Sequence, residues 1–227
     1  MTLTSLFACR DARSRQWQLG PLPPAAGRFT LLGWSQTVER RDAGVPDEVA
    51  RVLARALTSV SRVTFPCSFV NSIATSGWSP FDDDLIRALT DKGIAGRIVA
   101  KVKRTPPDLA LMSTVRPESA VRLFDDAGFP WWMQGQVVLL SDPDTPPLEI
   151  GQASLLALFD DDWTKQAALL ARVGVRGIVR PGVDGDVAGL LSLTDAFEQA
   201  VLGALERETR VAGIAWSLVP ETAFASR

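Results

Sequence analysis

The chain has 227 residues, 46% of them hydrophobic and 22% charged, with a formal net charge of −2. A chain of this length and balance can bury a sizeable core, as one large domain or two small ones, and extensive disorder is not expected. The weakly acidic charge gives no electrostatic reason to expect a nucleic-acid partner, because phosphate binding needs clustered cations.

Missing residue types exclude several chemistries. The chain has no His and no Tyr, so it cannot build a Ser-His-Asp or Cys-His mechanism or an imidazole zinc site on its own. We therefore predict no metal and no cofactor. Its 20 Arg and 4 Lys, with much Ala, Val, Leu and Gly, are typical of a GC-rich bacterial genome. Cys9 and Cys67 are isolated, which favours two reduced, packed thiols over a disulfide framework.

The N-terminal segment lacks the basic region and the long apolar run of a signal peptide. No stretch of 18 apolar residues is present to span a membrane. From these features we expect a cytoplasmic protein without a membrane partner.

The first third of the chain predicts short strands and then one helix. Residues 3–9, 16–19 and 28–35 are apolar or alternating, and Pro46 opens a helix with acids in its first turn. Its apolar stripe is Val49, Val52, Leu53, Ala56, Leu57 and Val60, with Arg51 and Arg55 on the other face. A β-branched strand follows at 62–69.

The middle of the chain predicts two helix–strand units, each with a hairpin. Ser79 caps a helix that ends near Gly93, and strands 94–103 and 109–115 follow it as a hairpin. A second helix, 117–128, precedes strands at 131–140 and 148–159, which are separated by a Pro-rich loop at 143–147.

The last part predicts a short helix ending at Gly174, a strand at 175–179, a long helix at 186–208 and a final strand at 211–219. Asp184 or Asp186 is expected to cap the long helix. Together, the elements predict an α+β (mixed α/β) fold, a mixed β-sheet with helix–strand units packed on it. Residues 1–227 are expected to form a single globular domain, and a division near 143–147 into two similar α/β subdomains is left open.

Two Asp triplets follow a Phe: Asp82, Asp83 and Asp84 after Phe81, and Asp160, Asp161 and Asp162 after Phe159. Acids at a helix start cap the helix and complement its dipole, which is their first expected role. An acidic partner-binding surface and a metal site are the alternatives. Because successive residues at a helix start do not face one point, one triplet rarely supplies a full set of metal ligands.

The neighbouring residues Trp131 and Trp132 form the sharpest aromatic feature of the sequence. Adjacent residues of a strand point to opposite faces, so both indoles are buried only if both faces are covered. Core packing and a protein-interface anchor are the two interpretations.

No phosphate loop, metal spacing or nucleophile motif is present, so binding rather than catalysis is expected. The concrete hypothesis is a cytosolic bacterial immunity protein that binds and neutralises a secreted, basic toxin domain. The partner-binding residues would be the two Asp triplets and the Trp pair. The alternatives are a carboxylate- or Mg²⁺-dependent hydrolase, with Asp82, Asp83, Asp125, Asp126, Asp160 and Asp161 as candidates, and a secretion-system adaptor or accessory protein.

Overall fold

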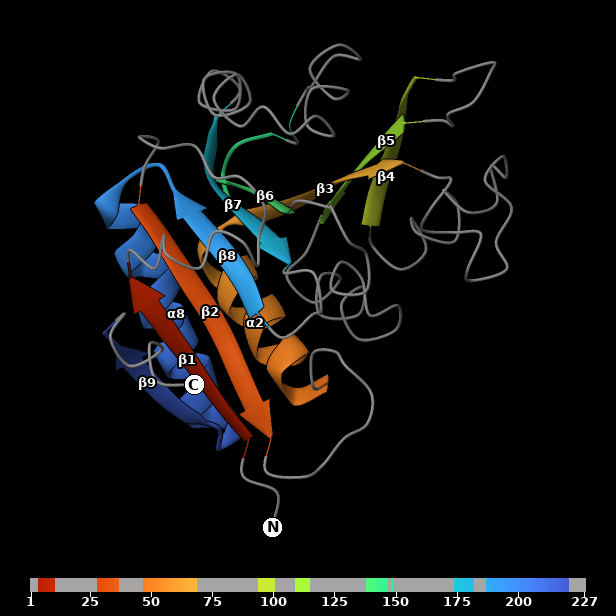
Figure 1. The fold of residues 1–227 in the computed structure, drawn as a ribbon. Coiled ribbons are helices and arrows are strands. Elements are labelled where there is room, and N and C mark those ends of the chain that lie inside the picture. Colours follow the sequence, from red (N-terminus) through yellow and green to blue (C-terminus); the bar gives the residue numbers. More distant parts are fainter. Residues whose placement is uncertain are drawn as a thin grey trace.

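The computed structural model describes residues 4–10, 28–36, 47–68, 94–100, 109–114, 138–146, 148, 174–181 and 187–220. Nine strands of this part of the chain form one sheet in the order β4-β5-β3-β6-β7-β8-β2-β1-β9. Two helices, α2 (Asp47–Val60) and α8 (Asp195–Ala212), pack against each other behind the strands in Figure 1. The strands are β1 (Thr4–Arg10), β2 (Arg28–Gln36), β3 (Arg62–Ser68), β4 (Ile94–Ala100), β5 (Leu109–Thr114), β6 (Val138–Ser141), β7 (Val175–Pro181), β8 (Val187–Ser192) and β9 (Ala215–Val219).

The sheet is mixed. Strands β1 and β9 pair in parallel, and the other neighbouring strands pair antiparallel. The predicted α+β fold with a mixed sheet is therefore confirmed. The predicted hairpin at 94–115 is present as β4 and β5.

Two units of the same connectivity make up most of the sheet. In the first, the antiparallel pair β1–β2 leads through α2 to β3, and in the second, the pair β7–β8 leads through α8 to β9. Strand β9, the third strand of the second unit, lies beside β1, the first strand of the first unit. Strand β3, the third strand of the first unit, lies on the outer side of β7, the first strand of the second unit, with β6 between them. The successive pairings make β3 parallel to β7, just as β9 is parallel to β1. The units are thus related in topology by an approximate two-fold axis between the central antiparallel strands β2 and β8.

Helix α2 forms where the sequence predicts it. Its apolar stripe is buried in the core except for Val60, which is partly buried, while Arg51 and Arg55 are exposed. At its end, the Thr58 and Ser59 hydroxyls donate to the carbonyls of Ala54 and Ala56, at 2.7 and 2.8 Å. Side-chain hydroxyls therefore supply partners to carbonyls in the last turns of the helix.

Helix α8 begins later than predicted. Residues 187–192 form β8, so a helix from Asp186 is wrong, and the cap is Thr194 rather than Asp184 or Asp186. The Thr194 hydroxyl accepts a hydrogen bond from the Phe197 amide at 3.2 Å. Helix α8 continues to Ala212, so the strand predicted from residue 211 is shortened to β9.

The end of α8 is closed by Gly213, which has φ 69°. The Gly213 amide donates to Arg210 O at 3.3 Å, and the Ile214 amide donates to Thr209 O at 2.9 Å. Buried Ile214 adds the apolar contact that usually accompanies this left-handed termination. The turn leads directly into β9.

The main core lies between the two helices and one face of the sheet. Leu53, Leu57, Val201 and Leu205 of the helices are fully buried against it, and the sheet contributes Leu6, Ala8, Leu32, Trp34, Val63, Val138, Leu140, Val179, Ala188 and Leu190. The opposite face also holds a buried cluster, made by Cys9, Phe29 and Leu31. Because β2 is buried on both faces, it reads as an almost continuous apolar run.

Cys9 is buried, and its thiol donates to Arg10 O at 3.7 Å. Among the helices of the described ranges, none has the length and apolar character needed to cross a membrane. The predicted elements at 16–19, 79–92, 117–128, 148–159 and 167–174, apart from Leu148 and Gly174, lie outside the described residues, as does most of the predicted strand at 131–140. The possible division of the chain near 143–147 stays a prediction.

Candidate functional site

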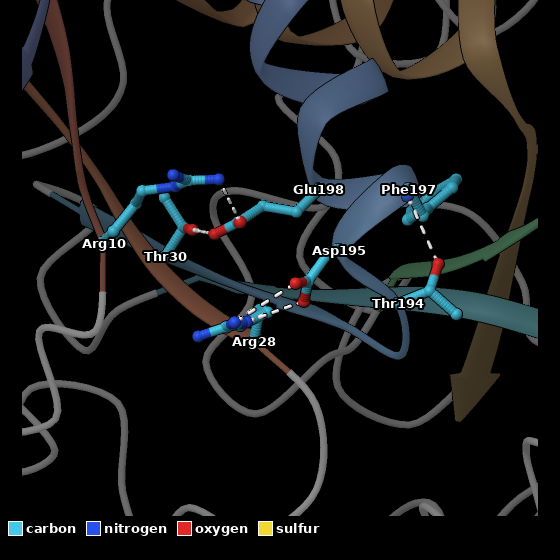
Figure 2. A network of polar contacts seen from close by, with 7 residues as sticks. All are labelled: Arg10, Arg28, Thr30, Thr194, Asp195, Phe197 and Glu198. Atoms are coloured by element: carbon cyan, nitrogen blue, oxygen red, sulfur yellow. Dashed lines mark hydrogen bonds and ion pairs between the residues drawn. The ribbon is translucent and has the colours of Figure 1, made fainter.

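A buried carboxylate lies at the junction of β1, β2 and α8. The Glu198 side chain is only 3% exposed. Its Oε2 atom accepts a hydrogen bond from Arg10 Nη2 at 2.6 Å, and its Oε1 atom accepts one from the Thr30 hydroxyl, also at 2.6 Å (Figure 2). Glu198 also sits in the first turn of α8, where the helix dipole favours negative charge. The buried charge is thus compensated from three sides.

A second ion pair lies beside this carboxylate, closer to solvent. Arg28 on β2 binds both carboxylate oxygens of Asp195, at 2.6 and 3.1 Å (Figure 2). The hydrogen bonds from Arg28 lower the pKa of Asp195, and the charges of Arg28 and Arg10 act in the same direction. Both side chains are at least half exposed, so this pair orients the start of α8 more than it stabilises the fold.

This charged cluster, which we call the α8 anchor, comprises Arg10, Arg28, Thr30, Asp195 and Glu198. The Glu198 carboxylate is engaged at both oxygens by side chains of the protein, and its burial keeps it from solvent. A general acid or base must instead reach a substrate. The geometry therefore fits a structural clamp between the β1–β2 pair and α8.

A second polar group fixes the turn after β6. Arg176 on β7 donates to Asp142 Oδ2 from Nε and Nη2, at 3.0 and 2.8 Å, and this contact raises the pKa of Arg176. Thr145 closes the turn by donating its hydroxyl to Asp142 O at 2.7 Å. Arg62 Nη2 on β3 donates to Pro143 O at 3.1 Å. Strands on both sides of β6 therefore hold the start of the predicted Pro-rich loop.

Among the residues that the structure describes, two buried hydroxyls have no hydrogen-bond partner, those of Ser141 at the end of β6 and Ser192 at the end of β8. Ser192 pairs with Gly177, whose face is covered by the ring of Phe197. Each Ser lies opposite an Arg in the sheet, Ser141 opposite Arg62 and Ser192 opposite Arg28, and among the described residues no interaction joins either hydroxyl to a base that could activate it as a nucleophile. These positions offer no catalytic arrangement within the described part of the chain.

All of the residues predicted to bind a partner lie outside the described residues. They are Asp82, Asp83, Asp84, Trp131, Trp132, Asp160, Asp161 and Asp162. The structure instead shows the α8 anchor, which sequence reasoning missed. Its only local signal is Thr194-Asp195, a capping residue followed by an acid, which marks the helix start but not its distant partners.

In the ranges that the structure describes, no group of three or more Cys, Asp or Glu side chains is placed to hold a metal ion. Comparisons with known protein families, with curated proteins and with solved structures find no match to this chain.

Proposed function

We propose that the protein is a non-enzymatic binding module, most concretely an immunity protein that binds and neutralises a secreted toxin with a basic surface. The observation that carries this proposal is the surplus of carboxylates in the two Asp triplets. The described helices show what a helix start in this chain uses: α8 has a Thr cap and two acids in its first turn, Asp195 and Glu198, and α2 begins with Asp47 and Glu48. Each triplet would bring three adjacent carboxylates to a predicted helix start, one more than either described helix has and more than capping requires.

The distribution of charge supports the same conclusion. Within the described ranges, arginines slightly outnumber carboxylates. The carboxylates of Glu198 and Asp195 are paired with arginines in the α8 anchor, and that of Asp142 is paired with Arg176. The net negative charge of the chain therefore comes from the remaining residues, which include both triplets. An acidic surface accelerates the encounter with a basic partner and raises specificity for it.

In this proposal, the triplets steer the toxin and Trp131 or Trp132 anchors it. Trp is the residue type most enriched at the energetic centre of protein interfaces. The described α8 anchor would serve as the rigid support, since it ties the helix layer to the sheet through contacts that need no partner.

The first experiment is a tagged pull-down from lysate of the native host, eluted at high salt and analysed by mass spectrometry. The proposal expects one dominant, stoichiometric partner with a basic surface, and it expects the chain to inhibit that partner's toxicity. A partner belonging to a secretion apparatus would favour an adaptor instead. If Mg²⁺ raises the melting temperature of the isolated protein, a formed carboxylate site, and with it the hydrolase alternative, is favoured.

The second experiment separates charge from helix capping. Asn caps helices about as well as Asp, so changing Asp82, Asp83 and Asp84 together to Asn removes charge while keeping the cap. We expect the association rate with the toxin to fall roughly tenfold and its salt dependence to weaken. The control is Asp144→Asn, at an exposed position in the turn after β6. Unchanged association by the triplet variant at low salt would refute the steering role.

A further inference from the structure

Strand β9 ends the sheet formed by the described residues, and none of these residues protects its outer edge in the usual ways. Its sequence, Ala215 to Val219, contains no charge and no Pro. Leu218 is 54% exposed, and Val211, in the last turn of α8, is 75% exposed. Edge strands in monomeric proteins are normally guarded by Lys, Pro, bulges or covering segments, because an open edge recruits another strand.

The approximate two-fold relation indicates what fits at this edge. By connectivity, β3 is the counterpart of β9, as the third strand of the other unit, although in the sheet β6 lies between β3 and β7. The outer edge of β3 is paired antiparallel with β5 over the register from Thr64–Ser113 to Ser68–Leu109. The matching edge of β9 has no strand from the described residues. The pairing of its counterpart β3 therefore indicates an antiparallel strand as the neighbour to expect at the β9 edge.

We propose that the β9 edge binds the β9 edge of a second copy of this chain, giving a symmetric dimer with a continuous sheet across the two molecules. The two-fold axis passes through Ser217, so that Trp216 of each copy lies opposite Leu218 of the other. A two-fold contact of this kind closes on itself and does not propagate into a fibre.

The side chains agree with this register. Trp216 pairs with Leu6, and Leu218 pairs with Ala8, whose side chains are both buried on the helix face of the sheet. Trp216 and Leu218 therefore project to that same face, and Trp216 already packs partly against the core. The dimer sets the exposed Leu218 of one copy against the Trp216 of the other, an apolar cross-strand pair.

Val211 extends the apolar contact. Helix α8 passes through Gly213 directly into β9, so its last turn lies at the start of the strand, the end at which the second copy's Leu218 arrives. The nearby charges of Glu206 and Arg210 are paired with each other at 3.1 Å. An uncharged strand beside a neutralised helix end offers nothing to a strongly charged partner, whereas a second β9 supplies matching apolar side chains.

Sedimentation velocity over a concentration series tests the dimer. The unmodified chain is expected to shift from monomer towards dimer, and Leu218→Lys is expected to weaken association roughly tenfold or more by placing a charge in the pairing edge. Gln199→Lys adds the same charge at an exposed position of α8, outside the β9 strand itself, and should leave association unchanged. Weak dimers typically have dissociation constants in the micromolar range, so a chain that stays monomeric up to about 100 μM overturns the proposal. So does dimerisation that Leu218→Lys leaves unchanged.

A cysteine placed on the symmetry axis tests the register. Directly opposite residues have Cβ atoms about 4.5–5.5 Å apart, close enough for a disulfide after small adjustment. Ser217→Cys is expected to give a covalent dimer under mild oxidation, and Ser59→Cys, exposed on α2, is expected to give little. Equal cross-linking of the two variants would refute the register. Because the toxin proposal uses other residues, a monomeric chain that still binds its partner would reject the dimer and leave that proposal intact.

Discussion

Changing Thr30 to Val measures how strongly the buried carboxylate fixes α8. Thr30 is fully buried, and its hydroxyl donates to Glu198 Oε1 at 2.6 Å. A hydrogen bond to a charged group contributes roughly 1.5–3 kcal/mol, and the extra buried methyl of Val offsets up to about 0.8 kcal/mol of the loss. We therefore expect the free energy of unfolding to fall by about 1–2 kcal/mol. In a chain of this size, that corresponds to a melting temperature lower by about 5 °C.

The assay is urea denaturation followed by Trp fluorescence, with Thr209→Val as the matched control. Thr209 is equally buried, but its hydroxyl donates to the uncharged helix carbonyl of Leu205 at 2.8 Å. Because that bond lacks charge assistance, the control should cost less than about 1 kcal/mol. Equal costs for the two variants would refute the special role of the carboxylate.

A double-mutant cycle with Glu198→Gln sharpens the test. Gln keeps the shape of Glu198 but removes the charge to which Thr30 donates. We expect the effects of Thr30→Val and Glu198→Gln to be non-additive by about 1 kcal/mol, since each removes the same charged hydrogen bond. Strict additivity would show that the contact between the two side chains contributes nothing to stability.

Two further predictions concern packing and pH. Gly33 on β2 pairs with Phe7 on β1, and a Cβ added at Gly33 would clash with the Phe7 ring. Gly33→Ala should therefore lower the free energy of unfolding, measured in urea, by about 1–3 kcal/mol. Adding Phe7→Leu to that variant should restore part of the lost stability. Because Arg28 lowers the pKa of Asp195, their pair stabilises the fold above the unfolded-state pKa of about 4 and ceases to do so as the pH falls through the lower folded-state value. Arg28→Gln should therefore reduce the melting temperature near neutral pH, and the difference from the unmodified chain should shrink on acidification. A difference that stays constant across the acid range would contradict this.

Local signals were sufficient for many elements. Helix α2 carries its acids, apolar stripe and exposed arginines in one short segment, and the structure places the helix there. The β4–β5 hairpin follows from two apolar runs around Thr105-Pro106-Pro107-Asp108. In each case the residues that decide the structure are neighbours in the sequence.

The predicted long helix failed for a physical reason. In the segment from Val187 to Ser192, all residues but the first are buried, because β2 and β7 pair with it on both sides. A strand buried on both faces shows a continuous apolar run, and its leucines also match a helical stripe. Thr194 marks the boundary between the two elements in the sequence: it follows the end of β8 and caps α8.

The α8 anchor could not be predicted from local pattern at all. Arg10 and Thr30 meet Glu198 across 188 and 168 positions of sequence. A Glu in the first turns of an amphipathic helix normally faces solvent, and only the order of the strands shows that this one faces β1 and β2. Strand order is set by tertiary packing that no single segment encodes.

The anchor also explains why the two topological units depend on each other. Helix α8 belongs to the second unit, yet its first turn is fixed by Arg10, Arg28 and Thr30 from the β1–β2 pair of the first. Strand β9 likewise pairs with β1 of the first unit, whereas β3 of the first unit reaches β7 of the second only through β6. Such long-range contacts make folding cooperative and comparatively slow. The third strands of the two units differ in one respect: β3 has β5 as an outer neighbour, whereas β9 has no outer neighbour among the described residues. An antiparallel second copy at β9 would remove that asymmetry, which is why the oligomeric state bears directly on how this sheet is completed.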